Sequence, residues 1–79
     1  MKLLLDGKSF ADKKAVHAYL KKELSFPEYY GNNLDAFYDL LCDIDFPVEF
    51  ELINMEAYQG FSDCIIDAMK INNNLSIKK

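Results

Sequence analysis

Polar and apolar residues alternate with a period of two over residues 48–53, and this pattern predicts a β-strand. Val48, Phe50 and Leu52 point to one face, while the two glutamates between them point to the other. A strand with this pattern is covered on one face and solvated on the opposite face. Shorter apolar runs predict two further strands, at Lys2–Leu5 and Leu75–Ile77.

Apolar residues spaced three or four positions apart predict three helices between these strands. The first helix is expected over about 12–24. It must end before Pro27, because the residue that precedes a proline avoids helical angles. The second begins at Asn32 or Asn33, since either side chain can accept the free amide hydrogens of a first helical turn. It should end within residues 42–45, before the next strand.

The third helix is expected from Asp63 to about Ile71. Ser62 is its predicted N-cap, and residues 54–60 are predicted to form a loop or a single irregular turn. Residues 72–74 are asparagines that should stop the helix, because asparagine tolerates left-handed backbone angles. Helices between successive strands favour parallel pairing. The predicted fold is therefore α/β, with two layers: a three-stranded parallel sheet and helices packed on one face, in the order β-α-α-β-α-β.

The composition is that of one small globular domain spanning residues 1–79. Hydrophobic residues make up 51% of the chain and aromatic residues 14%, which argues against disorder. No apolar stretch approaches the ~20 residues that span a membrane, and the leading run at 3–5 is too short for a signal peptide. Cys42 and Cys64 lack metal-ligand spacing and fit reduced thiols. We expect a cytoplasmic protein that is monomeric when free.

Charge is distributed unevenly about a net value of −4. All nine cations are lysines, and none lies between Glu23 and Met69. That stretch holds eleven of the thirteen acids, the other two being Asp6 and Asp12. Such a field attracts a basic partner and accelerates its association. It argues against direct binding to nucleic acid, which requires a basic protein face.

The second predicted helix carries three acids on one face, at Asp35, Asp39 and Asp43. Like charges four residues apart destabilise a helix by a few tenths of a kcal/mol, and aspartate is a poor helix former. Asp43 also lies near the helix end where the macrodipole disfavours an anion. These costs without a folding benefit indicate a surface that serves a partner. The side predicted to be buried consists of Leu34, Phe37, Tyr38 and Leu41.

Tyr29 and Tyr30 precede this helix and are followed by Gly31, whose backbone freedom allows a sharp turn. Tyrosine offers a rigid contact area with a polar tip and is enriched in binding hot spots. Carboxylates accept paired hydrogen bonds from arginine. The combination favours protein recognition, although one of the two tyrosines can instead be an ordinary residue at the edge of the core.

The chain lacks the motifs of catalysis. It contains no phosphate-binding glycine loop, zinc-ligand pair or nucleophile motif, and His17 has no companion for proton transfer. A divalent-metal or acid/base cluster at Asp35, Asp39 and Asp43 is the enzymatic alternative, but the outer two lie ~12 Å apart on a straight helix. We therefore predict no enzyme activity, no catalytic residue, no metal and no cofactor.

Two short segments, residues 20–24 (Leu-Lys-Lys-Glu-Leu) and 27–31 (Pro-Glu-Tyr-Tyr-Gly), closely resemble the barstar family of ribonuclease inhibitors. Residues 33–36 and Asp39 fall in the same register. The resemblance is dense over residues 17–39 and rests on the order of elements elsewhere. It implies a three-stranded parallel sheet with helices on one side, and a protein that plugs the active site of a small, basic, secreted ribonuclease without doing chemistry.

By position, the resemblance also implies roles for residues of the interface. Asp39 corresponds to the acid that enters the site of a substrate phosphate, and Asp35 to a second acid directed at basic groups beside it. Tyr29 corresponds to the aromatic residue that packs against a catalytic histidine. Asp67 corresponds to a further acid on the last helix. The remaining residues expected at the interface are Tyr30, Gly31, Asn33, Leu34 and Tyr38.

Three features depart from the family pattern. Tyr38 occupies a position that is commonly tryptophan, and the chain has no tryptophan. The segment between the second strand and the last helix is short and lacks one helix. Ile71 stands where another acid can follow Asp67 by one turn. The alternative function is therefore an acidic binding module of the same fold, an immunity or regulatory protein, for a different basic partner.

Overall fold

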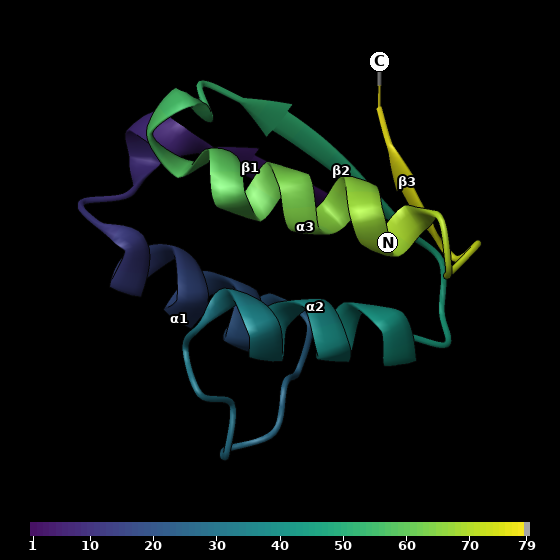
Figure 1. The fold of residues 1–79 in the computed structure, drawn as a ribbon. Coiled ribbons are helices and arrows are strands. Elements are labelled where there is room, and N and C mark those ends of the chain that lie inside the picture. Colours follow the sequence, from purple (N-terminus) through teal and green to yellow (C-terminus); the bar gives the residue numbers. More distant parts are fainter. Residues whose placement is uncertain (79) are drawn as a thin grey trace.

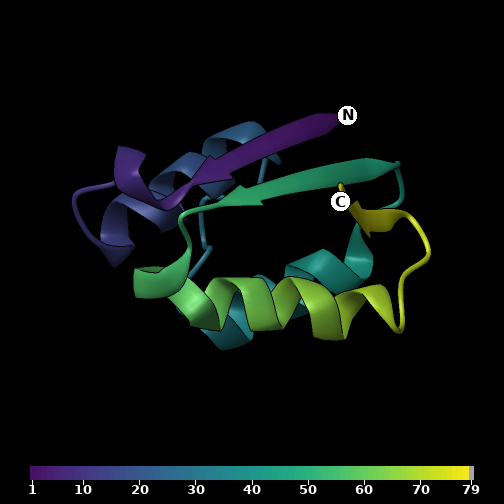
Figure 2. The same ribbon diagram turned by 90° about the horizontal axis from the view of Figure 1, so that it is seen from above.

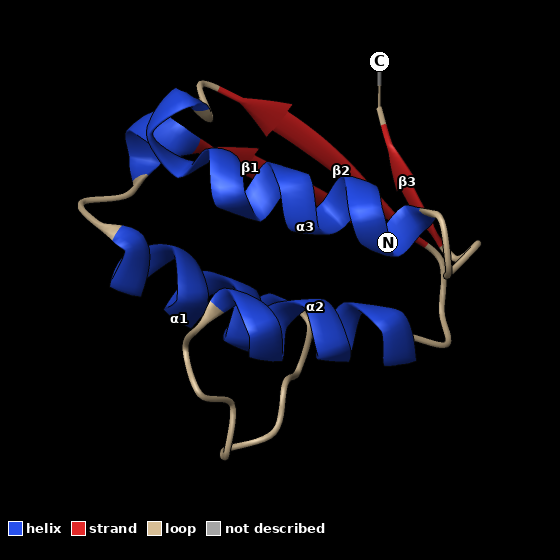
Figure 3. Ribbon diagram, viewed as in Figure 1, coloured by secondary structure: helices blue, strands red, loops and turns tan. Residues whose placement is uncertain are grey.

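The computed structural model describes residues 1–78 and has the predicted order of elements. Its strands are β1 (Lys2–Asp6), β2 (Val48–Ile53) and β3 (Leu75–Ile77). Its α-helices are α1 (Lys13–Glu23), α2 (Leu34–Asp43) and α3 (Gln59–Met69), with short 3-10 helices η1 (Gly7–Ser9) and η2 (Glu56–Tyr58). α2 and α3 pack along one another (Figures 1 and 3). Within the described residues, no helix is both long and apolar enough to span a bilayer.

The three strands form one parallel sheet in the order β1-β2-β3 (Figure 2), which confirms the predicted topology. Leu3 of β1 lies opposite Phe50 of β2, and both side chains are buried. Leu4 points to the other face and is 48% exposed, and Glu51 of β2 is only half-buried. Helices therefore cover one face of the sheet, and the predicted two-layer architecture is confirmed.

Aromatic side chains fill much of the space between the sheet and the helices. Phe37 of α2 and Phe61 of α3 are buried with ring centroids 5.7 Å apart. Phe26, from the segment between α1 and α2, lies 6.3 Å from Phe37 in an edge-on arrangement. Aromatic rings bury large areas and favour tilted packing. They give a chain of this length a core despite its unfavourable ratio of surface to volume.

α3 begins four residues earlier than predicted, directly after η2 and without a side-chain cap at its start. Gly60 lies inside the helix, and a Cβ at this position would be 2.7 Å from Leu34 Cδ1. A larger residue there would displace the end of the Leu34 side chain. Ser62, the predicted cap, is buried within α3, and its Oγ has no hydrogen-bond partner among the described residues. The prediction of a loop or a single irregular turn over 54–60 is confirmed in part: η2 is such a turn, while Gln59 and Gly60 already belong to α3.

The asparagines at 72–74 do follow the end of α3, but by a different mechanism from the one predicted. None of the three has a positive φ. The Asn72 side chain is buried and donates hydrogen bonds to the carbonyl oxygens of Leu41 (2.9 Å) and Ile44 (2.8 Å) at the end of α2. Its Oδ1 accepts from the backbone N–H of Asn74 at 3.0 Å. One side chain therefore connects the ends of α2 and α3.

Candidate partner-binding site

The loop between α1 and α2 turns at two residues with left-handed backbone angles, Ser25 (φ 55°) and Asn32 (φ 52°). The turn expected at Gly31 is therefore made by Asn32. At Gly31 itself a Cβ would lie 2.9 Å from the Nδ2 atom of Asn33, so a larger residue would displace the Asn33 side chain. Gly31 itself is exposed beside the start of α2.

Asn33 is the N-cap of α2. Its Oδ1 accepts a hydrogen bond from the backbone N–H of Ala36 at 2.8 Å, and its Nδ2 donates to the Gly31 carbonyl at 3.3 Å. This cap places Asp35 in the first turn of α2, where the positive end of the helix dipole favours an anion. Asn33 is exposed, so the same residue both shapes the helix start and faces solvent.

The two adjacent tyrosines lie in opposite environments. Tyr29 is 84% exposed, whereas Tyr30 is only 6% exposed. The Tyr30 ring packs 5.0 Å from Phe26, and its hydroxyl is hydrogen-bonded to His17 Nδ1 at 2.5 Å. Burial raises the pKa of Tyr30 to about 12. A side chain so enclosed has little surface to offer a partner, so Tyr29 is the tyrosine whose side chain is available for contact, while a role for Tyr30 at the interface stays a prediction. Tyr30 anchors the loop that presents Tyr29.

A shallow groove of about 570 Å³ brings together residues of α2 and α3. Its lining consists of Leu34, Asp35, Tyr38, Asp39, Cys64 and Asp67. Five of the nine residues predicted from sequence at the interface thus meet in one place. Tyr38 is half-buried, while Asp35 and Asp39 are exposed. Leu34, predicted on the buried side, is 36% exposed at the groove.

Three carboxylates and no cation line this groove. The pKa of Tyr38 is raised, first by burial, then by the neighbouring Cys42 side chain, and further by the charges of Asp67 and Asp39. Carboxylates of both helices therefore act on the same phenol. The groove presents concentrated negative charge beside a protonated hydroxyl, an arrangement suited to guanidinium and ammonium groups.

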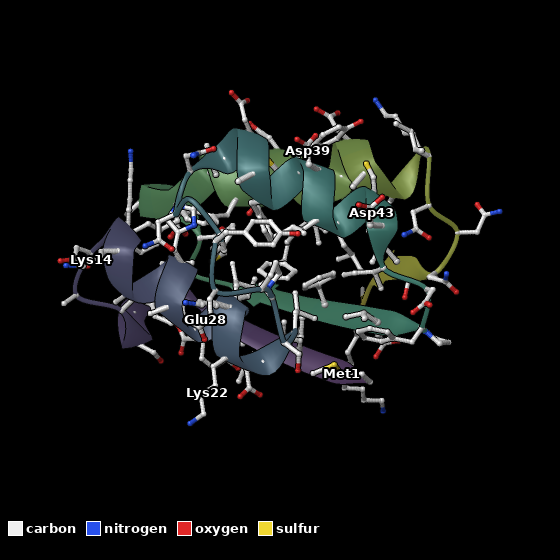
Figure 4. All side chains as sticks on the ribbon, turned by 90° about the horizontal axis from the view of Figure 1, so that it is seen from below. Met1, Lys14, Lys22, Glu28, Asp39 and Asp43 are labelled. Atoms are coloured by element: carbon white, nitrogen blue, oxygen red, sulfur yellow. The ribbon has the colours of Figure 1, made fainter. Side chains whose placement is uncertain are left out.

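Lys70 and Asp43 are charged residues outside the groove lining, and neither changes the acidic character of the groove. Asp67 lies 3.6 Å from the Lys70 ammonium, with side chains 62% and 74% exposed. Exposed pairs of this kind contribute about 1 kcal/mol or less, so Asp67 remains accessible to a stronger partner. Asp43 continues along α2 beyond Asp39 (Figure 4) but is not part of the groove lining.

Cys64 is the groove residue that sequence reasoning did not assign to the interface. It precedes Asp67 by three positions on α3, and this helical spacing is the signal that could have placed both on one face. Burial, and then the charges of Asp67 and Asp35, raise the pKa of Cys64, so the thiol stays protonated. No cluster of three or more histidine, cysteine or acidic side chains within residues 1–78 is arranged to hold a metal ion.

Comparison with known proteins places this site in a family context. The family model described as Barstar (barnase inhibitor) matches residues 1–64. A Bacillus subtilis (strain 168) protein named "Putative ribonuclease inhibitor YrdF" is 43% identical over 61 residues, which cover 76% of this chain and 67% of that protein. The family match spans β1, α1, the tyrosine loop, α2 and β2, and stops short of Asp67. With most of its length matched, the chain belongs to the barstar family.

Proposed function

We propose that this protein inhibits a small, basic, secreted ribonuclease by covering the enzyme's active site with the acidic groove. Membership of the barstar family and the name of the Bacillus subtilis relative support a ribonuclease-inhibitor-type role without catalysis. The observation that carries the more specific proposal is the groove itself. There Asp35, Asp39 and Asp67 gather from two helices with no lining cation.

The proposed mechanism is substitution of carboxylates for RNA phosphates. A ribonuclease active site must hold arginine, lysine or histidine side chains to bind the phosphates of its substrate. Asp39, in the middle of α2, is proposed to enter that site and accept hydrogen bonds from those cations, with Asp35 bonding basic groups beside it. Tyr29, on the loop before α2, offers an exposed ring to pack against the rim. RNA is then excluded, because the inhibitor occupies the part of the active site that RNA would fill.

The experiment is a titration of ribonuclease activity with this protein. Secreted proteins of the source organism are passed over the immobilised chain, and a captured ribonuclease is purified and assayed on RNA. We expect activity to fall to zero at one inhibitor per enzyme, with inhibition that is competitive with RNA. Inhibition that RNA cannot relieve would contradict the proposal that the groove covers the active site.

The alternative is a module of the same fold that binds a different basic partner. Ile71 supports it, because this apolar side chain is 65% exposed just beyond α3, where the family pattern allows another acid. Tyr38 in place of tryptophan supports it too. Capture of a basic protein without ribonuclease activity, through the same aspartates, would favour the alternative over the leading proposal.

We further propose that the protein acts in the cytoplasm as a monomer, where it protects the producing cell from ribonuclease that has not yet been exported. Cell fractionation should recover it with cytoplasmic markers. Light scattering of the free protein should give the mass of one chain at micromolar concentrations. Recovery outside the cell, or a dimer at those concentrations, would contradict these two points.

A further inference from the structure

The exposed Tyr29 ring is carried by a tight turn in the loop between α1 and α2. The backbone N–H of Tyr30 donates to the Pro27 carbonyl at 3.0 Å, which places Tyr29 at the third position of the turn. Because Tyr29 is 84% exposed, packing of its own side chain does little to hold it. The place of the Tyr29 ring therefore depends on how the two ends of this turn are fixed.

Buried aromatic side chains fix both ends of the turn. Phe26, just before the turn, is 9% exposed, and Tyr30, at its last position, is 6% exposed. Their ring centroids lie 5.0 Å apart, so the two residues pack on one another. Phe26 also meets Phe37 of α2 at 6.3 Å. The base of the turn is therefore packed against the helix that carries Asp39.

His17 of α1 contacts the same end of the turn through a hydrogen bond. Its Nδ1 is hydrogen-bonded to the Tyr30 hydroxyl at 2.5 Å, and both side chains are buried. The His17 ring also packs 4.7 Å from Phe61 of α3, the helix that brings Asp67 to the groove. His17 thus lies where α1, α3 and the loop meet.

A hydrogen bond at this place fixes orientation as well as packing. The apolar contact between Phe26 and Tyr30 allows the rings to slide, whereas a buried hydrogen bond is directional and specifies one arrangement. The ion pair between Lys21 and Glu28, at 3.2 Å, also connects α1 to the turn, but the Glu28 side chain is 98% exposed. Exposed pairs contribute little. Of these two side-chain links from α1, the one from His17 is therefore the stronger.

We propose that His17 is a positioning residue for partner binding, which acts through the Tyr30 hydroxyl to hold Tyr29 in place for the ribonuclease. The inference rests on the proposed inhibition and extends it to a side chain that is only 5% exposed. A turn that is fixed before binding loses less conformational freedom on association, so preorganisation increases affinity. Without the hydrogen bond, part of the binding free energy is consumed in ordering the Tyr29 ring.

The test removes the Tyr30 hydroxyl and keeps its ring. Tyr30→Phe should raise the dissociation constant of the complex with the captured ribonuclease by about fivefold or more. In the Tyr29→Ala background the same change should shift it by less than about twofold, because the residue that is positioned is gone. In the Asp39→Ala background the full effect should remain. Tyr58→Phe is the matched control. It removes the hydrogen bond of another core tyrosine, to the Phe10 carbonyl at 3.2 Å, and should leave affinity within about twofold.

Two replacements of similar size test His17 from the other side of the bond. His17→Leu leaves no polar group for Tyr30, whereas His17→Asn puts one on Cγ, where the imidazole carries Nδ1. We expect His17→Leu to weaken the complex as Tyr30→Phe does, and His17→Asn to recover most of the loss. In the free chain, backbone heteronuclear NOE values over residues 28–30 should fall in Tyr30→Phe and not in Tyr58→Phe, because they report picosecond to nanosecond motion.

Native affinity in Tyr30→Phe or in Tyr29→Ala overturns the inference, and so does equal weakening by Tyr30→Phe and Tyr58→Phe. An equal loss from Tyr30→Phe with and without the Tyr29 ring overturns it too, because the hydroxyl then has a merely structural role. Equal affinities in His17→Leu and His17→Asn, or unchanged NOE values in Tyr30→Phe, have the same consequence. The proposed inhibition is judged separately, by competition with RNA and by Asp39→Ala, so its failure is distinguishable from failure of this inference.

Discussion

Tyr29 and Tyr30 are neighbours in the chain, but one faces solvent and the other is part of the core. The local motif predicted a contact pair, with the reservation that one of them could be an ordinary residue. It could not indicate which one, because the partner that buries Tyr30 is His17, thirteen positions earlier. That contact depends on how α1 packs against the loop. Individual exposure in a loop is therefore a tertiary property, even where the residue types are recognisable.

Replacing each tyrosine should separate binding from stability. Tyr29→Ala should leave the free energy of unfolding within about 0.5 kcal/mol, because an exposed side chain is removed. Tyr30→Ala should lower it by about 3 kcal/mol or more, since an aromatic ring is deleted from the core and His17 loses its hydrogen bond. Denaturant titration measures both values. Equal destabilisation by the two variants would mean that Tyr29 is also structural.

His17 should make stability depend on pH near neutrality. Burial lowers its pKa below the ordinary value of 6.5, so the unfolded chain binds the proton more readily than the folded chain. The stabilisation is complete above pH 6.5 and is lost as the pH falls through that value toward the folded pKa. Urea titrations at several pH values between neutral and mildly acidic should show this loss.

His17→Gln is the control, because it removes the titrating group and keeps a polar side chain opposite Tyr30. Its stability should be flat over the same pH range. Asp6 does not contribute to the pH dependence in this range. Hydrogen bonds from Asn54 and the Lys8 backbone lower its pKa from 3.8, so its effect on stability falls at lower pH. An unchanged slope in His17→Gln would assign the pH dependence to other groups.

At the scale of elements, the strands were predictable and the start of α3 was not. The alternation at 48–53 gave β2 with its observed bounds, because one face of that strand is buried and the other is not. α3 begins without a side-chain cap and contains Gly60, a residue that usually weakens a helix. A Cβ at that position would meet the end of the Leu34 side chain on α2, a contact that the local sequence does not reveal. The groove between these helices is likewise a product of packing, so the spacing within α2 could not by itself bring Asp67 beside Asp35.

Of the three asparagines between α3 and β3, Asn72 should contribute most to the stability of the folded protein. Asn72→Ala leaves the carbonyl oxygens of Leu41 and Ile44 without their side-chain donor and should cost about 1–3 kcal/mol. Asn73→Ala, at the exposed neighbour, should change stability by less than about 0.5 kcal/mol. Thermal or urea unfolding compares the two variants. Similar effects would indicate that the turn, rather than the hydrogen bonds, provides the stability.

Across the whole molecule, charge is separated between two regions. Figure 4 shows Lys14 and Lys22 on α1, away from Asp39 and Asp43 on α2. The stretch from Glu23 to Met69, which contains α2, β2 and α3, has no lysine or arginine. This separation was evident from sequence, because it requires only the positions of charges along the chain. That three of these acids, Asp35, Asp39 and Asp67, line one groove could be seen only from the fold.

Association with the basic partner should therefore depend strongly on ionic strength. The screening length falls from ~30 Å to ~3 Å between about 0.01 M and about 1 M salt. The association rate constant should drop at least tenfold over that range, while the dissociation rate constant changes much less. Stopped-flow mixing with the captured ribonuclease measures the first of these. An association rate constant that is independent of salt would show that long-range electrostatic attraction does not accelerate binding.

The central claim is that Asp39 and Asp35 bind the partner's cations in place of phosphate. The most direct test measures the dissociation constant of the ribonuclease complex for Asp39→Ala, Asp35→Ala and the control Asp43→Ala, an exposed acid on the same helix outside the groove. We predict a loss of about 2 kcal/mol or more for Asp39→Ala, ~30-fold in the dissociation constant, a smaller loss for Asp35→Ala, and little change for Asp43→Ala. All three variants should fold as stably as the native chain or more stably, since like-charge repulsion along α2 is relieved. Native affinity in both Asp39→Ala and Asp35→Ala would contradict the claim.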